Sequence, residues 1–173
     1  METLTLPDML HNITAQLPAL VRLLTAIMYL VGFFFVFRGV LSLKQYAEMR
    51  SMMSSGTSMK EPLLYFLVGG LLIFYPSTIN VGLNTLFHST TILAYQPVKS
   101  GISEENEIFQ DVAMVLRFIG YISFFRGMMI LTHLGSQQAP PGTFGRAVAH
   151  IFGGIFLVNV FQTWEIIKST IGA

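Results

Sequence analysis

Two arginines lie inside apolar runs of this 173-residue chain, and each is followed by a glycine. Arg38 belongs to "VGFFFVFRGV" (31–40), and Arg126 belongs to "IGYISFFRGM" (119–128). An arginine at the centre of a membrane helix costs about 2.5–3.5 kcal/mol, and much less near a helix end, where it reaches the headgroups. Each guanidinium therefore either extends to the lipid headgroups or faces a lumen, a lipid phosphate or an acid on a partner subunit.

The other side chains that could do chemistry show no spacing typical of an active site. Cysteine is absent, the four histidines are scattered, and no nucleophile elbow or phosphate-binding glycine loop occurs. A coupled transporter usually needs ionisable groups within the membrane, and this chain offers only the arginines there. We therefore predict a protein that is not an enzyme and has no catalytic residue, cofactor or metal site. The net charge of +1 gives no reason to expect a nucleic acid as partner.

The composition indicates which elements must hold the two arginines. Hydrophobic residues make up 53% of the chain and charged residues 11%, whereas soluble domains carry about 25% charged residues. The apolar residues form blocks of roughly 20, the length of a bilayer span, and the blocks are apolar nearly all round. Transmembrane strands would instead alternate over segments of about 10 residues. We predict an all-α polytopic membrane protein with four transmembrane helices, over residues 23–43, 63–87, 112–134 and 147–167.

The second block changes character at Pro76. Proline lacks a backbone N–H group, and Ser77, Thr78, Asn80 and Asn84 follow it. Polar groups in lipid need partners within the protein or a wet cavity. Either the helix is kinked or broken around Pro76, or the span ends there and the rest lies at the interface.

Two parts of the chain resemble each other. Residues 31–39 match residues 119–127 at an offset of 88 in Val/Ile, Gly, Phe, Arg and Gly, and 67–74 match 151–158 through Gly-Gly at an offset of 84. The pattern predicts two tandem repeated helical hairpins that start on the same side of the membrane and are related by an axis along its normal. The predicted organisation is an N-terminal segment that could lie in the interface (1–19), a first hairpin (20–95), an acidic outer loop (96–111) and a second hairpin (112–173).

Small residues mark the predicted contacts between the helices. Membrane helices associate by close backbone packing, which glycine permits. We therefore assign six glycines to helix packing: Gly39, Gly69, Gly70, Gly127, Gly153 and Gly154.

The distribution of lysine and arginine predicts the orientation. Lys44, Arg50, Lys60 and Arg146 lie in or beside the two hairpin turns, and Arg38 and Arg126 lie toward the same ends. This side is predicted to be cytoplasmic, so both termini are predicted to be outside.

The stretch "MKEPLLYFLVGGLLIFYPSTIN" (59–80), the arginine-bearing helix before it and the four-span layout resemble a known family. They are similar to the IcmC/DotE family, with DotV and TraQ-related proteins, of the Dot/Icm type IVB secretion system. The resemblance implies a non-enzymatic subunit of the bacterial inner membrane, with periplasmic termini, in a hetero-oligomeric machine that exports effector proteins. The implied partners are DotA-like subunits, paralogous small membrane proteins and lipids.

Two other classes of function stay open on the residues alone. One is a small transporter or channel that acts by itself, and the other is a holin-like protein that permeabilises the membrane. In the secretion-subunit interpretation, glycine faces pack the hairpins while Arg38 and Arg126 line an interior or bind lipid headgroups.

Overall fold

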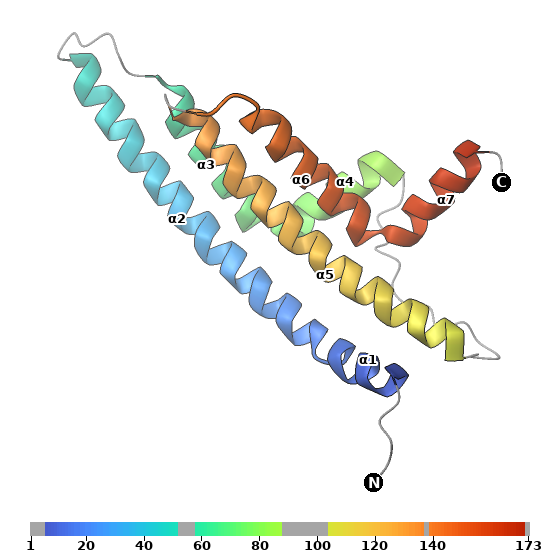
Figure 1. The fold of residues 1–173 in the computed structure, drawn as a ribbon. Helices are drawn as coiled ribbons and strands as arrows, with labels where there is room; N and C mark the ends of the chain where they lie inside the picture. Colours follow the sequence, from blue (N-terminus) through green and yellow to red (C-terminus); the bar gives the residue numbers. More distant parts are fainter. Residues whose placement is uncertain (1–5, 52–57, 88–103, 137–138, 172–173) are drawn as a thin grey trace.

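The computed structural model describes residues 6–51, 58–87, 104–136 and 139–171, and every secondary-structure element within these ranges is helical (Figure 1). The predicted all-α class is confirmed to that extent. The elements are α1 (Leu6–Thr14), α2 (Leu17–Ser51), α3 (Lys60–Ile73), α4 (Tyr75–Phe87), α5 (Glu104–Thr132), the 3-10 turn η1 (His133–Gly135), α6 (Thr143–Val158) and α7 (Val160–Ile171).

Two to four helical segments could cross a membrane by length and hydropathy. Two of them are single long segments, Met9–Ser51 and Gln110–Gly135. The other two are bent pairs: α3 meets α4 at 90°, and α6 meets α7 at 99°. The sequence predicts an unbroken fourth helix over 147–167, but α6 ends at Val158 and the chain turns there. Hydropathy averages over a window and does not register a change of direction.

The helices form two antiparallel pairs, α2 with α3 and α5 with α6. In Figure 1, α2 and α5 run side by side in the same direction, from lower right to upper left, and α3 and α6 return. After the bends, α4 and α7 both leave toward the right of that view. The helix α1 packs on the start of α5, where the Thr14 hydroxyl donates a 2.8 Å hydrogen bond to Asp111 Oδ1.

Helix ends differ from the predicted loops. The helix α2 continues to Ser51, so residues 44–51 of the predicted first turn are helical. The predicted outer loop (96–111) lies outside the described residues up to 103, and from Glu104 onward it belongs to α5. In the predicted N-terminal segment, residues 1–5 lie outside the description, α1 follows, and α2 already begins at Leu17.

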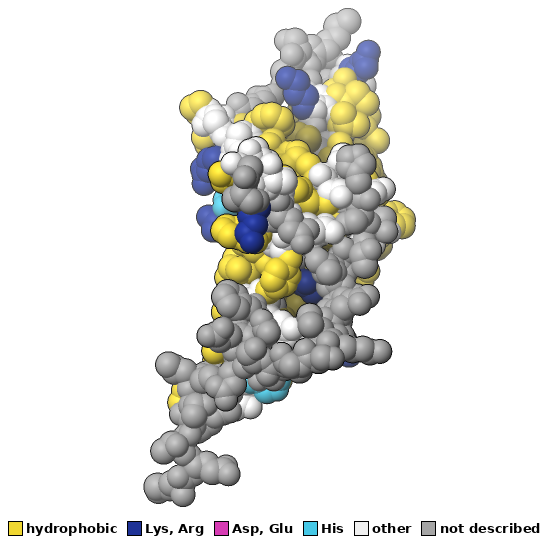
Figure 2. All heavy atoms as spheres, turned by 90° about the vertical axis from the view of Figure 1, so that its right-hand side faces the viewer, with side chains coloured by type: hydrophobic (Ala, Val, Ile, Leu, Met, Phe, Trp, Pro, Cys, Tyr) yellow, Lys and Arg dark blue, Asp and Glu magenta, His cyan; other side chains and the backbone are white. Residues whose placement is uncertain are grey.

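The buried core lies where the two hairpins meet and where their helices bend. Its fully covered side chains include Leu72, Ile79, Leu83, Phe124 and Val158. Large apolar side chains on the outer faces stay uncovered by protein, as with Leu30 (72% exposed) and Phe33 (69% exposed) on α2. Figure 2 shows hydrophobic side chains spread over the described part of one face, with lysines and arginines between them. Such an apolar surface suits acyl chains as its surroundings.

Candidate functional site at the two helix breaks

The second hairpin is closed by two glycines that face each other. A Cβ atom added to Gly120 would lie 2.8 Å from the carbonyl oxygen of Gly154, and a Cβ on Gly154 would lie 2.7 Å from the carbonyl oxygen of Gly120. Any side chain there would collide with backbone, which cannot yield as a flexible side chain can. The α5–α6 contact therefore requires glycine at both positions.

The first hairpin has the same arrangement at Gly32 and Gly69. A Cβ on Gly32 would lie 3.0 Å from the carbonyl oxygen of Gly69, and a Cβ on Gly69 would lie 2.9 Å from that of Gly32. A second contact lies one to two turns further along each hairpin, toward its connecting turn. There Gly39 meets the ring of Phe66, and Gly127 meets Ile151.

Gly70 and Gly153, the other members of the two Gly-Gly pairs, do not make the helix contacts that the sequence predicts. A Cβ added to either would meet nothing within 4 Å, so neither lies at a helix contact within the described structure. Adjacent residues are about 100° apart around a helix, and only one glycine of a pair can face the partner helix. Gly69 and Gly154 take that place, so the packing offset between these helices is 85 rather than the predicted 84.

Each break lies at one residue that leaves helical geometry. Phe74 ends α3 with φ −97° and ψ 31°, and its N–H donates to the carbonyl of Gly70 at 3.0 Å. Asn159 ends α6 with φ −121° and ψ 57°, and its N–H donates to the carbonyl of Ile155 at 3.4 Å. Both breaks therefore begin in the same way. The predicted kink residue, Pro76, is the second residue of α4, two positions past the break.

A threonine bridges each break from the far side. The hydroxyl of Thr78 donates to the carbonyls of Leu71 (3.0 Å) and Phe74 (3.1 Å). The hydroxyl of Thr163 lies 2.9 Å from the carbonyl oxygen of Phe156 and 3.0 Å from that of Asn159. A helix end leaves carbonyls without intrahelical donors, and in lipid such groups need a partner within the protein. The threonines supply that partner and join the two half-helices across the bend.

Arg117 supplies a further donor at the second break. Its Nε atom donates to the carbonyl oxygen of Val158, the last residue of α6, at 3.3 Å. The carbonyl end of a helix carries a partial negative charge, so a cation there is favourable. The positive charge within α5 is thus directed to the broken end of α6, and Arg117 is only partly exposed.

Tyr75, the first residue of α4, fills the space between the hairpins. Its ring meets Tyr121 edge-on at 6.0 Å and Phe124 at 5.9 Å between centroids. The side chain is 4% exposed, and among the described residues its hydroxyl has no hydrogen-bond partner. A buried hydroxyl without a partner lowers stability, so the aromatic contacts must offset that cost.

The two arginines of the sequence motif lie at the surface of the described structure. Arg38 and Arg126 are both exposed, although the glycine after each one packs on the partner helix. The guanidinium of Arg38 lies 5.9 Å from the centre of the Tyr65 ring, a cation–π contact. Within the described residues, no acid forms an ion pair with either arginine.

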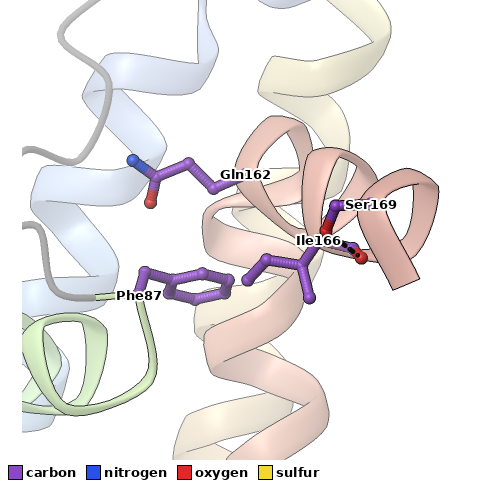
Figure 3. Close-up of a pocket in the computed structure, with 4 residues that line it drawn as sticks. All are labelled: Phe87, Gln162, Ile166 and Ser169. Carbon is purple, nitrogen blue, oxygen red and sulfur yellow. Dashed lines mark hydrogen bonds between the residues drawn. The ribbon is translucent and has the colours of Figure 1, made fainter. Parts of the chain in front are cut away.

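Pockets lie beside α7 and beside α1 in the described part of the structure. One, of about 280 Å³, lies between the end of α4 and α7 and is lined by Phe87, Gln162, Ile166 and Ser169 (Figure 3). The other, of about 380 Å³, lies between α1 and α5 and contains Asp111. In the described ranges, no three histidine, aspartate or glutamate side chains gather as a metal site would require.

Sequence reasoning missed the break at Asn159, the two threonine bridges and the role of Arg117. The sequence signal is one recurring threonine, Thr78 and Thr163 at an offset of 85, whereas the break residues Phe74 and Asn159 differ in type. Searches with protein-family models, against curated proteins and against solved structures found no match for this chain.

Proposed function

We propose that this chain is a non-enzymatic structural or channel-forming subunit of a bacterial inner-membrane secretion machine of type IVB, built from two tandem copies of one broken hairpin. The observation that carries the proposal is the set of matching contacts in the two hairpins. A protein whose repeated unit consists of helix-packing devices, with uncovered apolar faces outside, is suited to assembly with other membrane helices.

The tandem copies are supported by positions and by contacts. Gly32 and Gly39 correspond to Gly120 and Gly127 at an offset of 88. In the returning helices the corresponding residues are 85 positions apart. This offset relates Phe66 to Ile151 at the glycine contacts, and it also relates the two bridging threonines past the breaks. Apolar helices can align by chance, but a helix break and its hydrogen bonds at one offset are harder to obtain by chance, which supports the tandem copies.

The exposed arginines support assembly with partners or lipids. A charge on an apolar outer face is favourable where it meets a phosphate or an acid of a neighbouring subunit. In the proposed complex, Arg126 makes such a contact with a DotA-like or paralogous subunit or with a headgroup, and Arg38 occupies the equivalent place on the first hairpin.

The test is recovery of the complex from native membranes with a tagged chain, followed by mass spectrometry and an effector-export assay. Co-purification of secretion-machine membrane subunits, lost together with export in Arg126→Leu, is the expected result. The matched control is Arg22→Leu, another exposed arginine, which should keep both. Purification of the chain without such partners would contradict the proposal.

The paired breaks favour a second candidate, a small transporter or channel that acts alone. In many transporters, broken helices at corresponding positions of two repeats provide the substrate site, through freed carbonyls and half-helix ends. Here Phe74 and Asn159 provide two such breaks, and Arg117 lies at one of them.

Flux assays distinguish the candidates. The purified chain in liposomes should conduct no solute if it is a structural subunit, whereas a transporter or channel conducts and loses conduction in Arg117→Leu. A holin-like protein would instead collapse the membrane potential when expression alone is induced.

A further inference from the structure

The helix α6 is too short to cross a bilayer. Its 16 residues extend about 24 Å at 1.5 Å per residue, while the hydrocarbon core is about 30 Å thick. Arg146 is exposed in its first turn, which suits a start at the membrane surface. A helix that starts at one surface therefore reaches the turn at Asn159 while still inside the hydrocarbon, about 6 Å short of the boundary on the other side. An amphipathic surface helix buries its apolar face about 5–10 Å into that boundary.

The helix α7 leaves this depth at 99° to α6, so it runs nearly parallel to the membrane plane if α6 runs along the normal. The helix α3 repeats the geometry, with 14 residues, about 21 Å, and a 90° bend. Both returning helices therefore end within the same leaflet, and α4 and α7 extend from there in that leaflet.

The sequence of α7 is amphipathic in this orientation. Val160, Trp164, Ile167 and Ile171 follow one another at helical spacing on one face. Trp164 is 56% exposed and Ile171 is 74% exposed, so protein does not cover this face. The opposite face carries Gln162 and Ser169, both beside the pocket at α4 (Figure 3).

The pair of Trp164 and Lys168 marks a depth in the membrane. The ammonium group of Lys168 lies 5.5 Å from the centre of the Trp164 ring. Tryptophan is enriched at the membrane–water interface, and lysine there extends its ammonium group toward the headgroups. A helix at the bilayer centre would hold this charge at high cost.

We propose that α7 is a membrane-plane helix whose apolar face, the half-buried Val160 with the exposed Trp164, Ile167 and Ile171, binds the acyl-chain and headgroup boundary of one leaflet. Phospholipid is the occupant of this face, and α6 enters the bilayer without crossing it. The inference is independent of the proposed secretion partners, because the surface is complete within one chain.

The chain contains its own probe for the experiment. Trp164 is the single tryptophan of the sequence, so its fluorescence reports α7 alone. The full chain is reconstituted in phosphatidylcholine vesicles in which the acyl chains carry bromine near the carbonyl end, in the middle or near the terminal methyl. The matched control is Trp164→Phe with Phe152→Trp, because Phe152 is 44% exposed on α6, about 15 Å along that helix.

We expect shallow bromines to quench wild-type fluorescence more strongly than deep ones, and the control variant to show the reverse order. Trp164 fluorescence quenched most by the deepest bromines would mean that α7 continues across the bilayer, which overturns the proposal. Fluorescence unaffected by bromine at every depth would mean that water or another protein covers the face, which also overturns it.

A second measurement uses the absence of cysteine from the chain. In vesicles, Ser169→Cys should react with a membrane-impermeant maleimide much faster than Ile167→Cys, because these side chains lie on opposite faces of α7. Equal rates for the two variants would contradict a helix that lies in the interface. No partner protein is present in either assay, so failure of the secretion proposal would leave both results unchanged.

Discussion

Gly120 and Gly154 approach each other so closely that the Cβ of either one, if present, would lie within 2.8 Å of the other's carbonyl oxygen. The neighbouring residue, Gly153, has open space at the corresponding position. Two adjacent glycines thus have opposite structural roles, and this contrast allows a matched test of the packing.

Gly154→Ala should lower the free energy of unfolding in detergent by about 1–3 kcal/mol, because the added methyl group overpacks a backbone contact. Gly153→Ala should leave it unchanged or raise it by up to about 1 kcal/mol, since alanine favours the helix and meets no neighbour. In the first hairpin, Gly69→Ala and Gly70→Ala should differ in the same sense. Equal stability of the two variants of a pair would contradict the close approach of the helices.

Thr163→Val should destabilise the bend between α6 and α7. The carbonyl of Phe156 lies across the break from α7 and accepts its hydrogen bond from the threonine hydroxyl. Loss of such a bond within a membrane costs about 1–2 kcal/mol, measurable as a lower melting temperature. Thr85→Val is the control, because the Thr85 hydroxyl bonds to Val81 within a regular helix, and a change within about 0.5 kcal/mol is expected.

Arg117→Leu should cost about 1–3 kcal/mol, because the carbonyl of Val158 loses a charged donor and is itself buried. Arg117→Lys keeps the charge but not the Nε–H donor, and should fall between wild type and the leucine variant. Arg126→Leu changes an exposed arginine and should stay within about 0.5 kcal/mol. Denaturant titration of the three variants gives the order directly, and an Arg117→Leu protein as stable as wild type would contradict a structural role.

Tyr75→Phe should raise stability. The hydroxyl of Tyr75 is buried and has no partner among the described residues, so its removal relieves a desolvation penalty of about 1–3 kcal/mol while the ring contacts remain. Tyr29→Phe is the control, because Tyr29 is 41% exposed, and no change is expected. A lower melting temperature for Tyr75→Phe would show that the hydroxyl bonds to a group outside the described residues.

Some properties of this protein follow from its sequence alone. A window sum of hydropathy indicates helices of membrane length, and the apolar block around Arg126 is found within α5. The Phe-Arg-Gly motif also indicates that the glycine after each arginine matters, and Gly39 and Gly127 lie at helix contacts. The conclusion about helix length holds because the ability to span a bilayer depends on the composition of about 20 consecutive residues, which the sequence gives directly.

Other properties depend on the tertiary structure. The rotation of α6 about its axis decides whether Gly153 or Gly154 faces α5, and the Gly-Gly pair in the sequence does not specify that rotation. The direction change at Asn159 leaves the carbonyls of Phe156 and Val158 to be satisfied by Thr163 and Arg117, donors that lie four residues past the break and on another helix. Hydropathy alone indicated helices of membrane length, whereas contacts between helices decided where each one bends and which face it presents.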